Sequence, residues 1–89
     1  MSETKRAYFT YMVRCADGTL YTGFTVDDVQ RRIAMHNAGK GAKYTKSRRP
    51  VELVWYHEWE SEHEARSVEY HTKKLSRREK EEMVKEFGD

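Results

Sequence analysis

A small set of side chains in the 89-residue sequence could support hydrolysis of a phosphodiester bond. That reaction needs a group that orients and deprotonates water, a cation that neutralises the phosphoryl oxygens, and stabilisation of the leaving oxygen, often by a metal. Tyrosine or histidine can serve the first need, and the planar guanidinium of arginine matches phosphate oxygens. A carboxylate suits a hard cation such as Mg²⁺. The candidates are Tyr11, Tyr21, Arg31, Arg32, His36 and Glu69.

The two tyrosines belong to a segment with the pattern of a β-hairpin. Residues 6–15 are rich in aromatic and β-branched residues with apolar residues at alternate positions, which is typical of a strand. An Asp-Gly pair then favours a tight turn, and residues 20–24 read as the returning strand. Gly23 weakens that strand unless a backbone or ligand approaches closely there. The pattern therefore predicts that Tyr11 and Tyr21 lie close together.

The next predicted element is a helix that presents an arginine and a histidine on one face. Thr25 as N-cap with Asp28 three residues later fits a capping box, and Gly39 is a usual residue just past a helix end. We therefore expect a helix that runs from after Thr25 to about residue 38. Arg32 and His36 are four residues apart, so they share a face of this helix.

Basic residues are concentrated in the middle of the chain. Residues 29–51 contain seven of the 17 lysines and arginines and none of the 15 acidic residues. Such a local positive charge attracts polyanions, although a loop kept basic for solubility has the same composition. Residues 39–49 should form a loop, with one helical turn at most. The side chains expected to bind nucleic acid are Lys40, Lys43, Lys46, Arg48 and Arg49.

The remaining sequence predicts a third strand and two more helices. Residues 51–59 alternate so that one face carries Val51, Leu53, Trp55, His57 and Trp59. Capping boxes at Ser61 and Ser76 each start a helix. The first of these helices places Glu69 at the edge of a buried stripe, and the second should turn Met83, Val84 and Phe87 inward. The order is β-β-α-β-α-α, which predicts one α/β domain of the α+β type over residues 1–89.

Composition limits the other classes of protein. The chain is 37% hydrophobic and 36% charged, so its core must be small and rest on a few aromatic residues. No apolar run approaches the roughly 20 residues of a membrane helix, and the first residues lack the pattern of a signal peptide. The single cysteine, Cys15, excludes an intramolecular disulfide. We therefore expect a cytoplasmic protein without membrane association.

Four segments, taken together and in order, resemble the GIY-YIG endonuclease superfamily, above all its small, free-standing bacterial members. They span about residues 7–80 and read TYMVRCADGTLYTGFT, DDVQRRIAMHN, GKGAKYTKSRRPVELVW and SVEYHTKKLSRREK. The resemblance implies a three-stranded antiparallel sheet flanked by helices. The family's first motif falls on Phe9-Thr10-Tyr11, where only the tyrosine is kept, and its second falls on Tyr21-Thr22-Gly23.

The resemblance also implies roles for single residues. The family's catalytic arginine lies four residues before a His or Tyr on the same helix face, which gives Arg32 from His36. Counting forward from Gly23 gives Arg31 instead. We prefer Arg32, because helix phase fixes its position relative to His36, whereas a loop can absorb one extra residue. The family's metal-binding glutamate maps to Glu69. Members cut DNA with Mg²⁺ or Mn²⁺, which implies a metal-dependent DNA endonuclease in DNA repair or processing. Separately, we expect the protein to be a monomer.

Each of these assignments has a structural alternative. Tyr11 and Tyr21 fit ordinary cross-strand aromatic residues, and His36 fits a helix-end histidine that the helix dipole favours. Glu69 also fits a surface ion pair with Lys73 one turn later. At the level of function, the alternatives are a nucleic-acid-binding module of the same fold with little catalysis, and a protein-interaction domain. The last of these leaves the basic segment unexplained.

Overall fold

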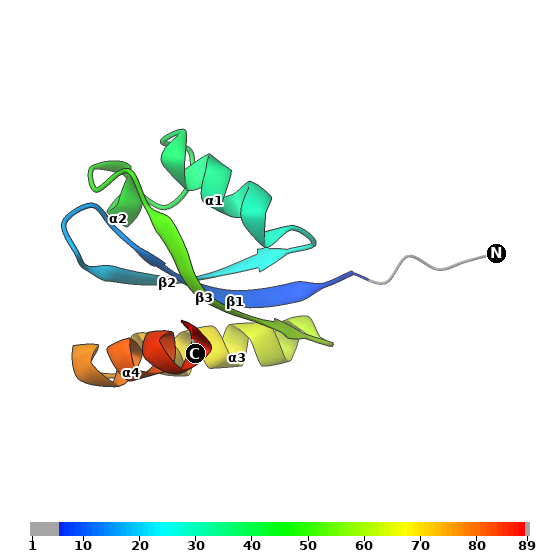
Figure 1. Ribbon diagram of the computed structural model, residues 1–89. Helices are drawn as coiled ribbons and strands as arrows, with labels where there is room; N and C mark the ends of the chain where they lie inside the picture. The colour runs from blue at the N-terminus through cyan, green and yellow to red at the C-terminus, as the bar shows by residue number, and fades with distance from the viewer. Residues whose placement is uncertain (1–5, 89) are drawn as a thin grey trace.

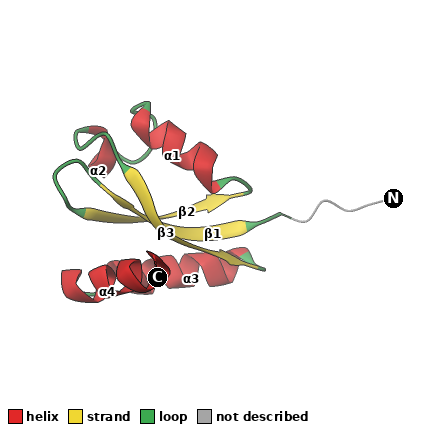
Figure 2. Cartoon of the chain, viewed as in Figure 1, coloured by secondary structure: helices red, strands yellow, loops and turns green. Residues whose placement is uncertain are grey.

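A three-stranded antiparallel sheet lies between two pairs of helices in the computed structural model, which describes residues 6–88. The elements are β1 (Tyr8–Arg14), β2 (Leu20–Val26), α1 (Val29–Asn37), α2 (Lys43–Lys46), β3 (Glu52–Trp59), α3 (Glu62–Lys73) and α4 (Arg77–Gly88). Figure 1 shows α1 and α2 on one face of the sheet and α3 and α4 on the other, and Figure 2 shows the same layers by type of structure. The predicted α+β class and the predicted order are confirmed, and α2 is the single helical turn expected in the basic loop.

The central strand β1 divides the buried residues between the two faces. The strand order is β2-β1-β3, and Tyr11 lies opposite Gly23 on one side and opposite Tyr56 on the other. On the other face, the Thr10 hydroxyl donates to the Ala65 carbonyl of α3 at 2.7 Å. A core cluster brings together side chains from β1, from α1 and from the start of β3. Its buried members are Phe9, Tyr11, Val13, Cys15, Val29, Ile33 and Val51.

Helix α1 begins after Asp28, so the expectation that Thr25 is its N-cap is wrong. The physical reason is that β2 continues to Val26, which remains paired with β1. Asp27 then turns the chain with a φ of 74°, a left-handed conformation that aspartate adopts more readily than most residues. The Asp28 carboxylate caps the helix by accepting from the backbone N–H of Arg31 at 3.1 Å. The predicted end at residue 38 agrees with the observed C-cap.

Strand β3 contains an irregularity that the sequence pattern did not indicate. The pairing with β1 shifts between Met12 and Val13, so Met12 lies opposite Trp55 and Val13 lies opposite Leu53, with Val54 as the extra residue. Leu53 therefore packs on the core cluster beside α1, whereas Trp55 shares the face that α3 covers. The expectation of a single apolar face along residues 51–59 is wrong, because a bulge reverses the alternation of side chains.

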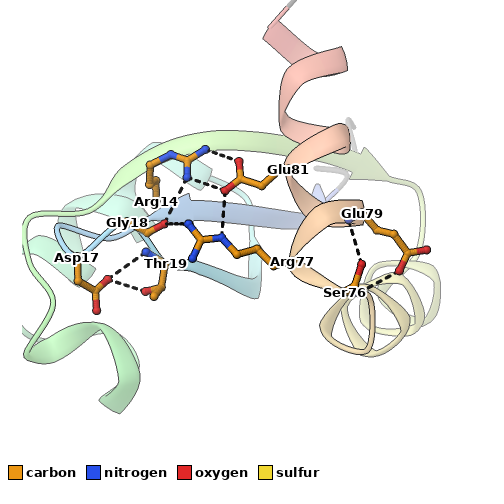
Figure 3. Close-up of polar contacts among 8 residues, drawn as sticks. All are labelled: Arg14, Asp17, Gly18, Thr19, Ser76, Arg77, Glu79 and Glu81. Carbon is orange, nitrogen blue, oxygen red and sulfur yellow. Dashed lines mark hydrogen bonds and ion pairs between the residues drawn. The ribbon is translucent and has the colours of Figure 1, made fainter.

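Helix α4 is held against the sheet by polar contacts and by Met83 and Val84, which are half-buried as expected. Arg14 on β1 binds both carboxylate oxygens of Glu81, with N–O distances of 2.8 and 3.0 Å, and Arg77 donates to the Gly18 carbonyl at 2.9 Å (Figure 3). No residue of α4 is fully buried. Phe87 is 46% exposed and its ring meets that of Tyr56 on the edge strand β3 edge-on, so the expectation that it turns inward is wrong. The reason is that α4 packs mainly on β3, at the margin of the sheet.

The two predicted capping boxes begin α3 and α4. The Ser61 hydroxyl accepts from the backbone N–H of Glu64 at 3.1 Å, and the Ser76 hydroxyl accepts from that of Glu79 at 3.2 Å. Within residues 6–88, none of the helices has the length and apolar character needed to cross a membrane.

Candidate active site

Tyr11 and His36 form a buried hydrogen-bonded pair where β1, α1 and α2 meet. Tyr11 is 1% exposed and His36 is fully buried. The Tyr11 hydroxyl lies 2.7 Å from His36 Nε2, and His36 Nδ1 lies 2.7 Å from the hydroxyl of Thr45 on α2. His36 lies on the inner face of α1, and its ring therefore connects the central strand β1 to the basic loop. Thr45 is a member of this site that the sequence pattern did not indicate.

The contacts of Thr45 favour one arrangement of protons. Its hydroxyl also lies 3.0 Å from the Ala42 carbonyl, and the single hydroxyl proton goes to that acceptor. His36 Nδ1–H then donates to Thr45, which leaves Nε2 to accept the phenolic proton of Tyr11. The backbone N–H of Ala42 also points at Nδ1 and would favour the opposite tautomer, but at 3.4 Å it is the longer contact. Because the contact of Nδ1 with Thr45 is the shorter one, we infer that Nδ1 carries the proton and that Nε2 accepts from Tyr11.

Burial keeps both members of the pair uncharged at neutral pH. Desolvation lowers the pKa of His36 to about 4, and the positive charge of Arg32 adds to this effect. Desolvation likewise raises the pKa of Tyr11 to about 12, against the opposing effect of its hydrogen bond with Arg32. A charged histidine exposed at the helix end, the alternative considered for His36, is therefore not what the fold contains. His36 acts on Tyr11 and has no surface of its own for a substrate.

Arg32 is the arginine that reaches the tyrosine. Its Nε lies 3.4 Å from the Tyr11 hydroxyl, and its side chain is half-buried. Arg31 is exposed, and its backbone N–H is used by the Asp28 cap. Among residues 6–88, no carboxylate forms an ion pair with Arg32, so its charge is available to an anion at this position.

Tyr21 lies beside the buried pair and is only half-buried. Its ring meets the His36 ring edge-on, with 5.6 Å between centroids, and is stacked on the ring of Tyr44 from α2 at 5.7 Å. Lys73 of α3 places its ammonium 5.5 Å from the centroid of the Tyr21 ring. Tyr21 is therefore in contact with side chains from both helical layers.

Glu69 reaches the same region from α3, on the other side of the sheet. Its side chain is 19% exposed and forms an ion pair with Lys73 at 3.3 Å, so the surface pairing considered as an alternative is present. Its partner Lys73 lies 5.5 Å from the centroid of the Tyr21 ring, and the negative charge of Glu69 adds slightly to the effect of burial in raising the pKa of Tyr11. In the described part of the chain, no group of three metal-ligating side chains forms. One carboxylate fits Mg²⁺ or Mn²⁺, since Mg²⁺ commonly binds one or two carboxylates and takes its other ligands from water and phosphate.

Two glycines make room for the buried pair. A Cβ on Gly23 would lie 2.5 Å from the Cζ and hydroxyl oxygen of Tyr11, and a Cβ on Gly41 would overlap the His36 ring at Nδ1. Neither glycine has a positive φ, so the space that a side chain would occupy is what requires glycine there. Gly23 was expected to have a structural role at the site. Gly41 was missed, because a glycine in a polar loop is ordinarily explained by a turn.

The five basic residues expected to bind nucleic acid divide into two groups. Lys40, Lys43 and Lys46 are exposed, and none of the ion pairs found within residues 6–88 includes them. Arg48 is bound within the protein through Asp17, with 3.0 Å between Nε and the carboxylate. Arg49 donates to two backbone carbonyls, one in α1 and one in α2. The two arginines therefore hold the loop in place.

Comparisons with known proteins show the family to which the chain belongs. The family model described as the GIY-YIG catalytic domain matches residues 7–82. A UPF0213 protein from Staphylococcus haemolyticus is 52% identical over 79 residues, which cover 89% of this chain and 95% of that protein. The UPF0213 protein YazA from Bacillus subtilis is 47% identical over 79 residues, covering 89% of this chain and 79% of the relative.

Two solution NMR structures have the same fold. The UPF0213 protein from Bacillus halodurans is 48% identical and matches with a TM-score of 0.57 over 89% of this chain and 83% of its own. A protein from E. faecalis is 40% identical and matches with a TM-score of 0.58 over 99% of this chain and 92% of its own.

Proposed function

Because the chain belongs to the GIY-YIG family, we propose that it is a metal-dependent endonuclease that hydrolyses DNA phosphodiester bonds. The observation that carries the proposal is the placement of Arg32 against the Tyr11 hydroxyl, whose proton His36 accepts. A cation next to a phenol with a proton acceptor behind it can supply two of the needs of phosphodiester hydrolysis, which are acceptance of a proton from water and neutralisation of the phosphoryl oxygens.

In this mechanism Tyr11 accepts a proton from the attacking water while its own phenolic proton passes to His36 Nε2. The transfer makes the imidazole cationic when negative charge builds on the phosphoryl group, so the two developing charges offset each other. Arg32 neutralises the phosphoryl oxygens, and Tyr21, the more exposed tyrosine, orients the water. Glu69 would hold one Mg²⁺ or Mn²⁺ ion, which when bound supplies stabilisation of the leaving oxygen.

The exposed lysines of the basic loop would position the nucleic acid. Lys40, Lys43 and Lys46 would contact phosphates on either side of the cleaved bond, and such contacts fix register without reading the base sequence. Arg48, through Asp17, and Arg49, through backbone carbonyls, would hold this surface in place. Recognition of backbone and shape in this way suits a monomeric cytoplasmic enzyme of DNA repair or processing.

The test is cleavage of branched, nicked and flapped DNA in the presence of Mg²⁺ or Mn²⁺. We expect Arg32→Ala and Glu69→Gln to lower the rate by about 10²-fold or more, as loss of one stabilising group commonly does. Arg31→Ala is the matched control and should keep the wild-type rate, because Arg31 points to solvent. Equal rates in all variants, or no cleavage of any substrate by the wild type, would contradict the proposal.

A second candidate is a nucleic-acid-binding module with little catalysis. The observation that favours it is the burial of Tyr11, which raises the pKa of its hydroxyl to about 12 and makes deprotonation at neutral pH costly. Phe9-Thr10 in place of the family's Gly-Ile is consistent with this reading. A salt-dependent gel shift without cleavage, unchanged by Glu69→Ala, would decide for this candidate.

A further inference from the structure

Besides His36, the ring of Tyr21 contacts a neighbour that the mechanism above does not use, Tyr44. Its ring packs against Tyr44 in an offset stack, with an interplanar angle of 19°. The guanidinium of Arg48 lies over the ring of Tyr44, with its Cζ 3.9 Å from the ring centroid. Arg48 Nη1 also donates to the Tyr44 carbonyl at 2.9 Å, so both the ring and the backbone of Tyr44 are fixed by the same arginine.

Arg48 is in turn fixed by the turn between β1 and β2. Its Nε lies 3.0 Å from the Asp17 carboxylate, and its carbonyl accepts from the backbone N–H of Ala16 at 2.9 Å. Thr19 donates to Asp17 through both its hydroxyl, at 2.6 Å, and its backbone N–H, at 3.1 Å, which fixes the carboxylate. A continuous series of contacts therefore runs from Asp17 through Arg48 and Tyr44 to Tyr21.

We propose that Tyr44 and Arg48, held by Asp17, are positioning residues that fix the ring of Tyr21 for catalysis, an inference that rests on the proposed nuclease function. Tyr21 follows the turn directly on β2, and the series closes a loop that begins and ends in the hairpin. The hydroxyl of Tyr21 thereby keeps its place relative to Arg32 and Tyr11. The positions of reacting groups must be held closely, because a misplacement of about 1 Å can lower a rate by about 10²-fold.

An exposed tyrosine beside a nucleic-acid site is usually expected to stack on a base. Tyr44 is 37% exposed, but Tyr21 is stacked against its ring and Arg48 lies over that ring. With those neighbours in place, its ring has little room for a base. We therefore assign to Tyr44 the role of holding the ring of Tyr21 and not that of stacking on a base.

The matched control is Tyr70, which is 57% exposed and has the ammonium of Lys74 at 4.3 Å from its ring centroid. It shares with Tyr44 an exposed ring and a basic side chain over that ring. The difference is that Tyr70 meets the ring of its neighbour His71, which is not one of the site residues. Substitutions at Tyr44 and Tyr70 therefore remove similar surface interactions with different consequences for Tyr21.

The first measurement is independent of activity and uses NMR of the full chain with ¹³C-labelled tyrosine rings. We expect Tyr44→Leu and Arg48→Gln to shift the ring resonances of Tyr21, because the stacked ring or its support is removed. Tyr44→Phe should preserve them, because it keeps the stack, and Tyr70→Leu should leave them unchanged. Tyr21 resonances that stay at wild-type positions in both Tyr44→Leu and Arg48→Gln would overturn the proposal.

The second measurement separates kcat from KM for DNA cleavage. We expect Tyr44→Leu to lower kcat by about 10- to 100-fold with little change in KM, and Tyr44→Phe to restore kcat. An increase in KM with kcat unchanged would mean that Tyr44 binds DNA directly, and would overturn the proposal. If the wild type cleaves no substrate, the proposed function fails, and the Tyr21 resonances alone still decide whether Tyr44 and Arg48 hold the ring.

Discussion

The imidazole of His36 is enclosed by protein on every side that its nitrogens face. Nε2 meets the Tyr11 hydroxyl, Nδ1 meets the Thr45 hydroxyl, and the absence of a side chain at Gly41 leaves room for the ring. A buried polar group with partners at each polar atom costs little, whereas the same group in its charged form is costly. The stability of the fold is therefore linked to the protonation of this one residue.

That linkage gives the stability of the protein a defined dependence on pH. The pKa of His36 falls from 6.5 to about 4 on folding, so between these values the unfolded chain binds a proton that the folded chain does not. Above about pH 6.5 the protonation of His36 does not reduce the free energy of unfolding. As the pH falls toward 4, this free energy should decrease by about 3 kcal/mol. Urea unfolding of the wild type and His36→Gln, near pH 7 and near pH 4.5, measures this. Parallel losses in the two proteins would contradict the assignment.

The glycines beside the buried pair predict a second effect at this scale. Gly23→Ala would press a methyl group on the Tyr11 ring, and Gly41→Ala would press one on His36. We expect each change to lower the free energy of unfolding by about 1–3 kcal/mol, the usual cost of overpacking a filled site. Chemical denaturation measures the loss. Gly88→Ala is the control, because nothing lies within 4 Å of its added methyl group, and wild-type stability in the first two variants would refute the steric argument.

At the scale of elements, α4 depends on the ion pair between Glu81 and Arg14. Hydrogen bonds from Arg14 hold the pKa of the Glu81 carboxyl below its ordinary value. About one third of the Arg14 side chain and one third of the Glu81 side chain are exposed. The ion pair therefore contributes fully to stability above the ordinary carboxyl pKa, and its contribution is lost as the pH falls through the lowered pKa of Glu81. We expect Glu81→Gln to cost about 1 kcal/mol near neutral pH, measured by denaturant unfolding. Glu82→Gln, on the same helix and exposed, should cost nothing measurable, and equal losses would contradict the pairing.

The elements themselves follow from local sequence, and their exact boundaries do not. The hairpin turn and the capping serines are short-range signals, so both could be placed from the sequence. The start of α1 could not, because β2 extends to Val26 through its pairing with β1, a contact between strands. The bulge at Val54 has the same origin, since it depends on how β3 fits β1.

The site residues also divide into those that a local sequence pattern places and those that depend on contacts between elements. Helix phase was sufficient to pair Arg32 with His36, and the structure brings Arg32 to Tyr11. Burial of His36 depends on how α2 folds back over α1, which no local pattern encodes. For this reason Thr45 and Gly41 could not be linked to the site from the sequence, and neither could the pairing of Arg48 with Asp17.

At the scale of the whole molecule, an excess of positive charge is concentrated in one helical layer, while the other layer carries charges of both signs. Residues 29–51, which include α1 and α2, contain seven basic residues and no acidic ones, while every acidic residue lies elsewhere. The face that carries α1 and α2 in Figure 1 should therefore attract DNA, and the opposite face should attract it less.

This separation predicts how binding depends on salt. Replacing Lys40, Lys43 and Lys46 together with glutamine should reduce the slope of log affinity against log salt by about 0.9 for each phosphate of duplex DNA that a lysine no longer neutralises. Fluorescence anisotropy with a labelled duplex measures the slope. Lys80→Gln with Lys85→Gln on α4 is the control and should leave it unchanged. A similar reduction from either face would show that binding does not use the basic loop.

Gly23 on the edge strand β2 lies against Tyr11, whose hydroxyl Arg32 of α1 contacts on one face of the sheet, whereas Glu69 belongs to α3 on the other face (Figure 1). This arrangement has a consequence for the order in which the protein matures. The central strand β1 lacks its second partner until residue 59 has been synthesised, and the carboxylate follows ten residues later. A nascent chain that ends within the basic loop holds both tyrosines, Arg32 and His36, but no complete site. The proposed cleavage of DNA would thus require the last-made helices, so partly made chains would carry the charge that attracts DNA without a complete site to cut it.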